Sequence, residues 1–151
     1  MLREAIIERM KTALRAKDTR TLSTVRMIMA GLKDRDIAAR SDGNKAEIPE
    51  SEILRMLQGM VKQRRESIEL YQKGNRPELA QQESEEIAVI ETFLPQQMDD
   101  GGIEVAAKTA IAEAGASGIK DMGKVMAALR ERHTGVIDLA RAGAVVKRLL
   151  G

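Results

Sequence analysis

Apolar side chains recur every third or fourth residue along most of this chain, which is the spacing of one face of an α-helix. The first such segment covers residues 2–17, where four apolar residues stand four positions apart: Leu2, Ile6, Met10 and Leu14. Alternation of apolar and polar residues, which marks a half-buried strand, appears nowhere in the sequence. The pattern therefore predicts an all-α protein.

Four of the predicted helices lie in the N-terminal part of the chain. Asp18 is placed to accept hydrogen bonds from the first free amides of the second helix. The turn-forming residues 41–44 end that helix, and Pro49 and Pro77 begin the third and fourth, because a proline at a helix start lacks the amide that would go unpaired there. We expect one four-helix domain over residues 1–94, which ends where the next proline stops the fourth helix.

Three shorter helices are predicted after that proline. Asp99 is the expected N-cap of the fifth helix, and the seventh helix covers residues 139–149. The sixth helix carries an apolar stripe formed by Ile119, Met122, Val125, Met126 and Leu129. We interpret this stripe as core, so that residues 99–151 form a three-helix bundle with little core to spare.

Composition excludes several kinds of chemistry. The 151 residues contain no Cys and a single His, His133, so the sequence offers no disulfides, thiolate catalysis or thiolate metal sites. We find no phosphate-binding loop, no dinucleotide-binding turn and no Ser in a nucleophile motif. We therefore predict a protein without catalytic residues, metal ions or cofactors.

Two charged clusters in the N-terminal domain are interpreted as solvated helix faces. The acidic cluster comprises Glu83, Glu85 and Glu86. The basic cluster comprises Lys62, Arg64 and Arg65. Helical spacing pairs Lys62 with Glu66 and Arg65 with Glu69, so the basic face is expected to be neutralised by its own helix. The alternative for the basic face is a surface that docks a phosphate or a partner.

Charge is distributed unevenly along the chain. The net charge of +2 gives no general attraction to nucleic acid, but from Lys120 onward seven basic residues stand against three acidic ones. No apolar run reaches the roughly 18 residues of a membrane helix, and the N-terminus lacks the apolar segment of a signal peptide. We expect a cytoplasmic protein.

Four stretches of the sequence resemble, in the same order, signature stretches of the GatB/YqeY family. They are Leu22–Met27, Val61–Ser67, Phe93–Gln97 and Gly115–Met126, the last combining a glycine-broken helix start, two lysines and an apolar stripe. The chain looks like a free-standing YqeY-like protein. Its last third is similar to the helical tail of the B subunit of tRNA-dependent amidotransferases.

This resemblance implies a function in RNA binding. In those amidotransferases the core of the B subunit handles the phosphorylated acyl-tRNA, while the helical tail grips the tRNA elbow. Nothing in this chain resembles the core, so the resemblance implies a non-catalytic module that binds tRNA or associates with an amidotransferase or another translation-related protein. The alternatives are a helical protein-interaction adaptor and a carbon–nitrogen ligase that uses glutamine as amido donor.

The candidate RNA contacts lie around the sixth helix. Lys120 and Lys124 are four residues apart and share one helix face, and the loop 115–118 leaves backbone amides near the helix start that can bind phosphate. The full set of candidates is Ser117, Gly118, Lys120, Gly123, Lys124, Arg130, Arg132, His133 and Lys147. His133 stands near a helix end, where capping and RNA contact are both possible roles.

The sequence departs from the family in two ways that weaken this surface. The loop from His133 to Leu139 has Val136 where relatives often carry a base, and Gly118 stands where they often carry serine. No aromatic platform for base stacking is available in this part of the chain either, because Tyr71 and Phe93 belong to the N-terminal domain.

Overall fold

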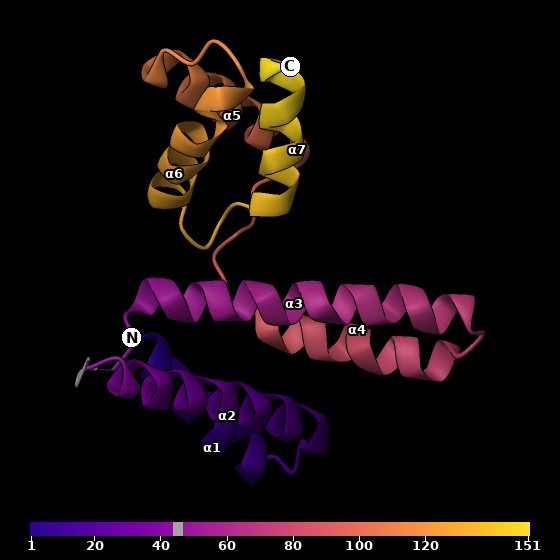
Figure 1. The fold of residues 1–151 in the computed structure, drawn as a ribbon. Coiled ribbons are helices and arrows are strands. Elements are labelled where there is room, and N and C mark those ends of the chain that lie inside the picture. The colour runs from indigo at the N-terminus through magenta and orange to yellow at the C-terminus, as the bar shows by residue number, and fades with distance from the viewer. Residues whose placement is uncertain (44–46) are drawn as a thin grey trace. The chain divides into compact units, whose positions relative to one another are not determined.

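The computed structural model describes residues 1–43 and 47–151, and Figure 1 shows their arrangement. Within these residues the chain forms seven α-helices and one short 3₁₀ helix, and no β-strand. The predicted all-α class is confirmed. The described residues divide into two compact units, Met1–Leu94 (unit 1) and Pro95–Gly151 (unit 2). None of the described helices is long and apolar enough to span a membrane.

Unit 1 consists of α1 (Leu2–Arg15), α2 (Thr19–Ser41), α3 (Glu50–Lys73) and α4 (Pro77–Glu91). Asp18 caps α2 as predicted, because its carboxylate accepts a hydrogen bond from Thr21 N at 3.1 Å. Prolines stand at the starts of α3 and α4, also as predicted. Asn44, the last residue of the predicted turn at 41–44, lies outside the described residues.

Aliphatic side chains from all four helices form the core of unit 1. One from each helix is completely buried: Ile6, Ile28, Leu57 and Ile90. Leu14, predicted on the same face as Ile6, is instead 56% exposed. A four-residue step turns about 400°, so a stripe made only of such steps drifts by about 40° at each step and leaves the buried face.

The basic cluster of unit 1 does not form the self-paired face that the sequence predicted. Arg64 of α3 is buried and donates from Nε to Glu86 Oε2 of α4 at 3.0 Å. Arg65 reaches Glu91 of α4 at 3.3 Å rather than Glu69 of its own helix. Both pairs link α3 to α4, which run side by side (Figure 1). A spacing rule within one helix cannot find partners on the next helix.

The acidic cluster is also part of the helix contacts and is not a face made only of solvated carboxylates. Glu85 reaches Arg20 of α2 at 3.3 Å, and Glu86 is buried with Arg64. Glu83 is half-buried beside Glu86, and burial together with the neighbouring carboxylate raises its pKa. Glu85 and Glu86 therefore take part in the contacts of α4 with α2 and α3.

Unit 2 consists of α5 (Asp100–Ala114), the 3₁₀ helix η1 (Ile119–Asp121), α6 (Met122–Arg132) and α7 (Leu139–Leu150). Asp99 caps α5 as predicted, since its Oδ1 accepts a hydrogen bond from Gly102 N at 2.7 Å. Asp138 caps α7 in the same way through Ala140 N at 2.9 Å. Before α5, Met98 N donates to Val136 O at 2.8 Å, which ties the start of α5 to the loop between α6 and α7.

The apolar stripe of the predicted sixth helix is core, with one exception. Val125 and Leu129 are buried, and Met122 and Met126 pack against the same cluster from half-buried positions. Ile119 is 52% exposed, because it stands in η1, before the α-helix begins, and is not carried round to the buried face.

Candidate nucleic-acid interface

The predicted sixth helix begins later than the sequence indicated. Lys120 lies in the 3₁₀ turn η1, and α6 starts only at Met122. Lys120 and Lys124 are both exposed beside this helix start. They do not share one face of one continuous α-helix, however, because the backbone changes conformation between them.

Asp121 stabilises this turn through two hydrogen bonds. Its backbone amide donates to Gly118 O at 3.0 Å, and its carboxylate Oδ2 accepts from Ser117 N at 3.0 Å. The bond from Ser117 N, and after it the charges of Lys120 and Lys124, hold the pKa of Asp121 below its ordinary value. The carboxylate therefore stays ionised at neutral pH and offsets part of the positive charge of the two lysines.

The loop before η1 does not offer the free amides that the sequence predicted for phosphate. Gly115 N and Ala116 N donate to carbonyls of the last turn of α5, at 3.2 and 3.1 Å. Gly115 closes α5 in the left-handed conformation, with φ of 62°, which glycine adopts without strain. With Ser117 N bound to Asp121, three of these amides are occupied, so this part of the prediction is wrong.

Gly118 and Gly123, also among the predicted RNA contacts, leave open surface beside the lysines. A Cβ added at either position would meet no atom within 4 Å. The φ of Gly118 is −166°, an extended conformation that any residue adopts. Neither glycine is required by the fold, and both leave the backbone accessible next to Lys120 and Lys124.

Half of the basic side chains of unit 2 are held by acids of the same unit. The pairs are Lys108–Glu104, Arg132–Glu113, Arg141–Asp100 and Arg148–Glu104. The other four are exposed and form no ion pair within the described part of the chain: Lys120, Lys124, Arg130 and Lys147. All four are among the predicted RNA contacts.

The end of α7 carries Lys147 to the start of α6. A Cβ added at Gly143 would lie 3.9 Å from Met126 Cε, and one added at Gly151 would lie 3.4 Å from Ile119 Cδ1. Lys147 stands four residues after Gly143, which turns it about 40° around the axis of α7, and its side chain is exposed beside this contact. Figure 1 shows the C-terminus of α7 at the end of unit 2 where α6 begins.

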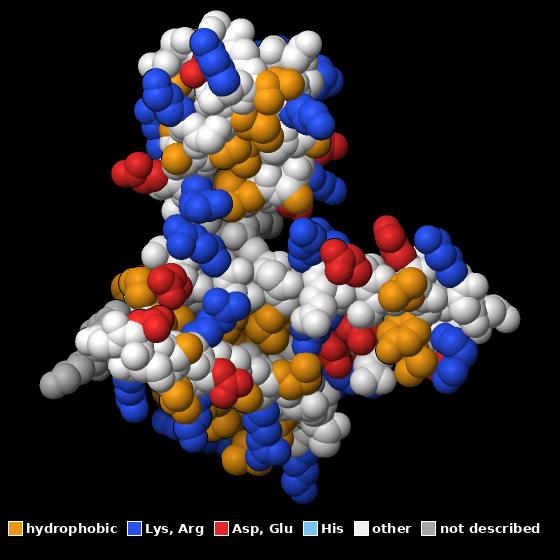
Figure 2. All heavy atoms as spheres, in the orientation of Figure 1, with side chains coloured by type: hydrophobic (Ala, Val, Ile, Leu, Met, Phe, Trp, Pro, Cys, Tyr) orange, Lys and Arg blue, Asp and Glu red, His pale blue; other side chains and the backbone are white. Residues whose placement is uncertain are grey.

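We call Lys120, Lys124 and Lys147 the lysine end of unit 2. Figure 2 shows Lys and Arg side chains on both sides of an apolar strip on the visible face of this unit. Side chains of α6 and α7 that are only partly buried include Met122, Met126, Val145 and Leu149. The lysine end thus combines unpaired positive charge with neighbouring apolar surface.

The remaining candidates lie at the other end of α6. Arg130 is six residues after Lys124, which turns it roughly 120° away around the helix axis. Arg132 pairs with Glu113 of α5. His133 closes α6 with its backbone amide, which donates to Leu129 O at 3.0 Å. The nine predicted residues therefore fall into two groups, one at each end of α6.

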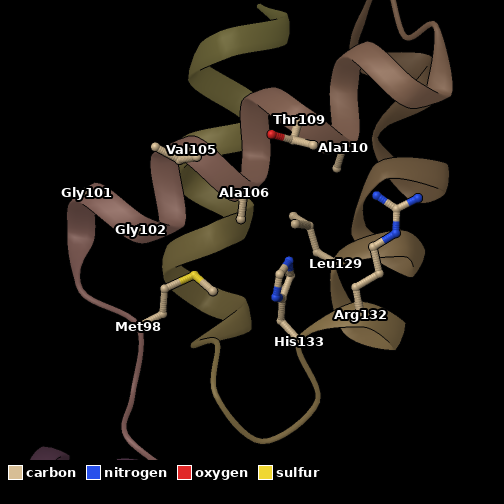
Figure 3. A pocket seen from close by; sticks show the side chains of 10 residues that line it. All are labelled: Met98, Gly101, Gly102, Val105, Ala106, Thr109, Ala110, Leu129, Arg132 and His133. Carbon is tan, nitrogen blue, oxygen red and sulfur yellow. The ribbon is translucent and has the colours of Figure 1, made fainter.

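His133 is the C-cap residue of α6, as the sequence indicated, and its side chain lines a pocket. This pocket has a volume of about 440 Å³ and lies between the first turns of α5 and the end of α6 (Figure 3). The side chains and backbone that line it include Met98, Gly102, Val105, Leu129, Arg132 and His133. Sequence patterns could not predict this pocket, because its two walls are at least 19 positions apart in the chain and meet only through helix packing.

Comparison with known proteins identifies the same family as the four sequence stretches. The family described as Yqey-like protein matches residues 3–150. The chain is also similar to altered inheritance of mitochondria protein 41, mitochondrial, of Lachancea thermotolerans, with 30% identity over 99 residues, which are 66% of this chain and 51% of that protein. The protein of the same name from Vanderwaltozyma polyspora is 30% identical over 97 residues, which are 60% of this chain and 50% of that protein.

The chain spans about half the length of the curated relatives it matches. The family match, in contrast, runs from the first turn of α1 to the last turn of α7 and includes both units and both ends of α6. On that match the chain belongs to the YqeY-like family.

Proposed function

We propose that this protein binds RNA, with tRNA as the expected ligand, and that the lysine end is the contact surface. The observation that carries the proposal is that Lys120, Lys124 and Lys147 are exposed without an ion-pair partner among the described residues, on the parts of η1, α6 and α7 that pack together. RNA phosphates would supply the missing partners, and release of their counterions would favour binding.

The resemblance to the helical tail of the amidotransferase B subunit supports tRNA as the ligand. That tail binds tRNA without carrying the catalytic residues of the enzyme, and we propose the same division of labour here: a non-catalytic module that works alone or beside a translation-related protein. The two curated relatives carry the word mitochondrial in their names, and those names state no ligand. These names do not place this chain in a compartment, and we propose that it acts in the cytoplasm.

A second candidate function is that of a protein-interaction adaptor. The exposed Ile119 and the half-buried Met122 and Met126 put apolar surface next to the lysine end. An amphipathic helix of a partner protein with acidic flanks would fit such a surface. The two functions differ in their response to salt, because phosphate binding weakens steeply with salt whereas apolar docking does not.

The test is a binding titration of the full chain with total tRNA at several salt concentrations. Three phosphate contacts predict that log K falls with log salt with a slope of roughly −2 to −3. The double variant K120E/K124E should bind at least tenfold more weakly, because two charge reversals repel every phosphate within about 8–10 Å.

The matched control is K33E/K73E, which makes the same change in net charge on exposed lysines of unit 1 that form no ion pair in the described part of the chain. The control should bind like the parent protein. Equal losses in both variants would mean that the net charge matters and the lysine end does not. Salt-independent binding, or none, would reject the RNA function and leave the adaptor.

A further inference from the structure

The pocket beside His133 is not used by the lysine end, and its chemistry differs from that of a phosphate contact. We propose that this pocket receives one unstacked nucleobase of a bound RNA. The inference rests on the proposed function and adds to it a contact that reads a base, because the lysines reach only the backbone.

The walls of the pocket suit the flat, apolar face of a base. Met98, Val105 and Leu129 line it, and Gly102 adds backbone without a side chain. No Asp or Glu is among the lining residues. The volume of about 440 Å³ is within the range of small-molecule binding sites.

His133 supplies a ring and polar atoms at this place. In Figure 3 its imidazole points into the space between α5 and α6, next to Met98 and Leu129. Every fully buried side-chain N or O atom among the described residues has a hydrogen-bond partner. The ring nitrogens of His133 have none there, so they are not fully buried. Its nitrogens are therefore accessible, and an imidazole both stacks on bases and offers one donor and one acceptor when neutral.

His133 also supplies a ring in a part of the chain that has no Phe, Tyr or Trp for base stacking. Tyr71 and Phe93, the only Tyr and Phe, belong to unit 1, and the chain has no Trp. His133 thus carries the only aromatic ring of unit 2. If unit 2 stacks on a base at all, this ring is the group that does so.

One cation, Arg132, lines the pocket, and two others, Arg130 and Lys124, lie further along α6. Arg132 forms an ion pair with Glu113. Because a guanidinium has five N–H donors, others remain for a phosphate. Arg130 stands three residues before His133, about one helical turn, and forms no ion pair within the described residues. Lys124 lies nine residues before His133, about 14 Å along the helix axis, a span that a short stretch of single strand covers. Phosphates on both sides of an inserted base would therefore meet positive charge.

The competing occupant is an aromatic side chain of a partner protein, which needs the apolar walls but not the cations. An NMR titration of the full chain with small molecules distinguishes a nucleobase from such a side chain. The imidazole signals of His133 need no assignment, since the sequence has one histidine. The probes are the four nucleoside monophosphates, ribose 5-phosphate and N-acetylphenylalanine amide, each at millimolar concentration.

We expect at least one nucleoside monophosphate to shift the His133 signals in a saturable way, and ribose 5-phosphate to cause a several-fold smaller shift. Equal shifts from ribose 5-phosphate would show a phosphate contact only and would overturn the base pocket. A shift from the phenylalanine amide without one from any nucleotide would assign the pocket to a partner protein. No shift from any probe would also overturn the proposal.

Two glycine variants test whether the pocket itself is responsible. A Cβ at Gly102 would lie 2.6 Å from Met98 Cγ and must displace this side chain of the pocket wall, whereas a Cβ at Gly59, an exposed position of α3 in unit 1, would meet no atom within 4 Å. Gly102→Ala should weaken nucleotide binding several-fold, and Gly59→Ala should not, with helical circular dichroism retained in both. Equal binding by the two variants would place the nucleotide elsewhere.

Failure of this inference and failure of the proposed function give different results. If tRNA binds in a salt-dependent way that K120E/K124E abolishes, but the His133 signals of the parent stay unchanged on tRNA binding, only the base pocket is wrong. If nucleotides shift His133 but tRNA does not bind at all, the RNA function is wrong, and the claim that the pocket takes a base of a bound RNA fails with it.

Discussion

Arg64 of α3 and Glu86 of α4 form an ion pair at 3.0 Å in which the two side chains are only 7% and 12% exposed. Arg64 also donates from Nη1 to Met60 O at 3.2 Å, and its Nη2 lies 3.8 Å from Met27 Sδ of α2. The guanidinium thus joins three helices of unit 1. Because two charges have been taken out of water together, removing one has a different consequence from removing both.

Replacing Arg64 alone should therefore be costly. We expect Arg64→Met to lower the free energy of unfolding by about 3–5 kcal/mol, since Glu86 is left buried without a partner. The double variant R64M/E86L should recover most of this loss, because two apolar side chains fill the same space. Urea unfolding followed by circular dichroism measures both. Arg65→Met, at the exposed pair with Glu91, is the control and should cost less than about 1 kcal/mol.

A double variant as unstable as Arg64→Met would show that the guanidinium acts through its bonds to Met60 and Met27 and that the pairing with Glu86 contributes little.

Asp36 should make unit 1 sensitive to acid. Arg3 donates to both of its carboxylate oxygens, at 2.9 and 2.8 Å, and Ile48 N donates at 2.9 Å. These bonds, first of all that from Arg3, hold the pKa of Asp36 below its ordinary 3.8. A lowered pKa in the folded state gives stability that is complete above the unfolded value and is lost as pH falls through the folded one.

We therefore expect Asp36→Asn to be less stable than the parent at pH 7, by about 1–3 kcal/mol for a buried network that loses its charge. The difference should shrink as the pH is lowered through and below 3.8. Unfolding by urea at a series of pH values measures this. A difference that stays constant over the whole range would mean that the charge of Asp36 is not responsible.

Glu83 should show the opposite dependence. Its pKa is raised above 4.5, mainly by burial and then by the charge of Glu86. The folded state therefore binds a proton more readily than the unfolded state, so this contribution is present at low pH and is lost as pH rises through the folded pKa. Glu83→Gln should be more stable than the parent at pH 7, with the gain disappearing below pH 4.5. Carboxyl NMR titration of the parent gives an independent measure of the pKa.

The sequence was most informative where one segment determines its own structure. The carboxylates of Asp18 and Asp99 begin their helices as predicted, because a cap depends only on amides two or three residues away. The two prolines act in the same local way. The helix periodicity also found most core positions, although it could not show that the drift of a four-residue repeat exposes Leu14.

What the sequence missed depends on contacts between helices. The partners of Arg64 and Arg65 lie on α4, so spacing along α3 assigned Arg65 to Glu69 and found no partner for Arg64. The approach of Lys147 to the start of α6 depends on how α7 packs, and the pocket at His133 depends on how α5 packs. The occupied amides before η1 depend on one carboxylate that reaches back four residues, from Asp121 to Ser117.

The cap of α5 should contribute measurably to unit 2, which has a small core. Asp99 accepts the hydrogen bond from Gly102 N, whereas the neighbouring Asp100 is exposed and only reaches Arg141 at 3.5 Å. We expect Asp99→Ala to destabilise unit 2 by about 1 kcal/mol and Asp100→Ala to have an effect below about 0.5 kcal/mol. Thermal unfolding followed by circular dichroism compares them. Equal effects would mean that the acidic first turn matters as a whole and that the specific cap does not.

Core and surface residues of α6 should respond in opposite ways to added negative charge. Met122 and Met126 pack into the cluster of unit 2, and their Cε atoms lie 3.8 and 3.9 Å from where a Cβ of Gly143 would stand. The double variant M122D/M126D places unpaired carboxylates against this helix contact, a cost that a small bundle cannot offset. Thermal unfolding should show that unit 2 has lost its transition, while the transition of unit 1 remains.

The control variant K120E/K124E adds the same number of acids to exposed positions a few residues away. It should leave both transitions almost unchanged, since exposed charges contribute little to folding. If M122D/M126D melts like the parent, the methionines belong to the ligand-facing surface, and the core of unit 2 is formed by Val125 and Leu129 without them.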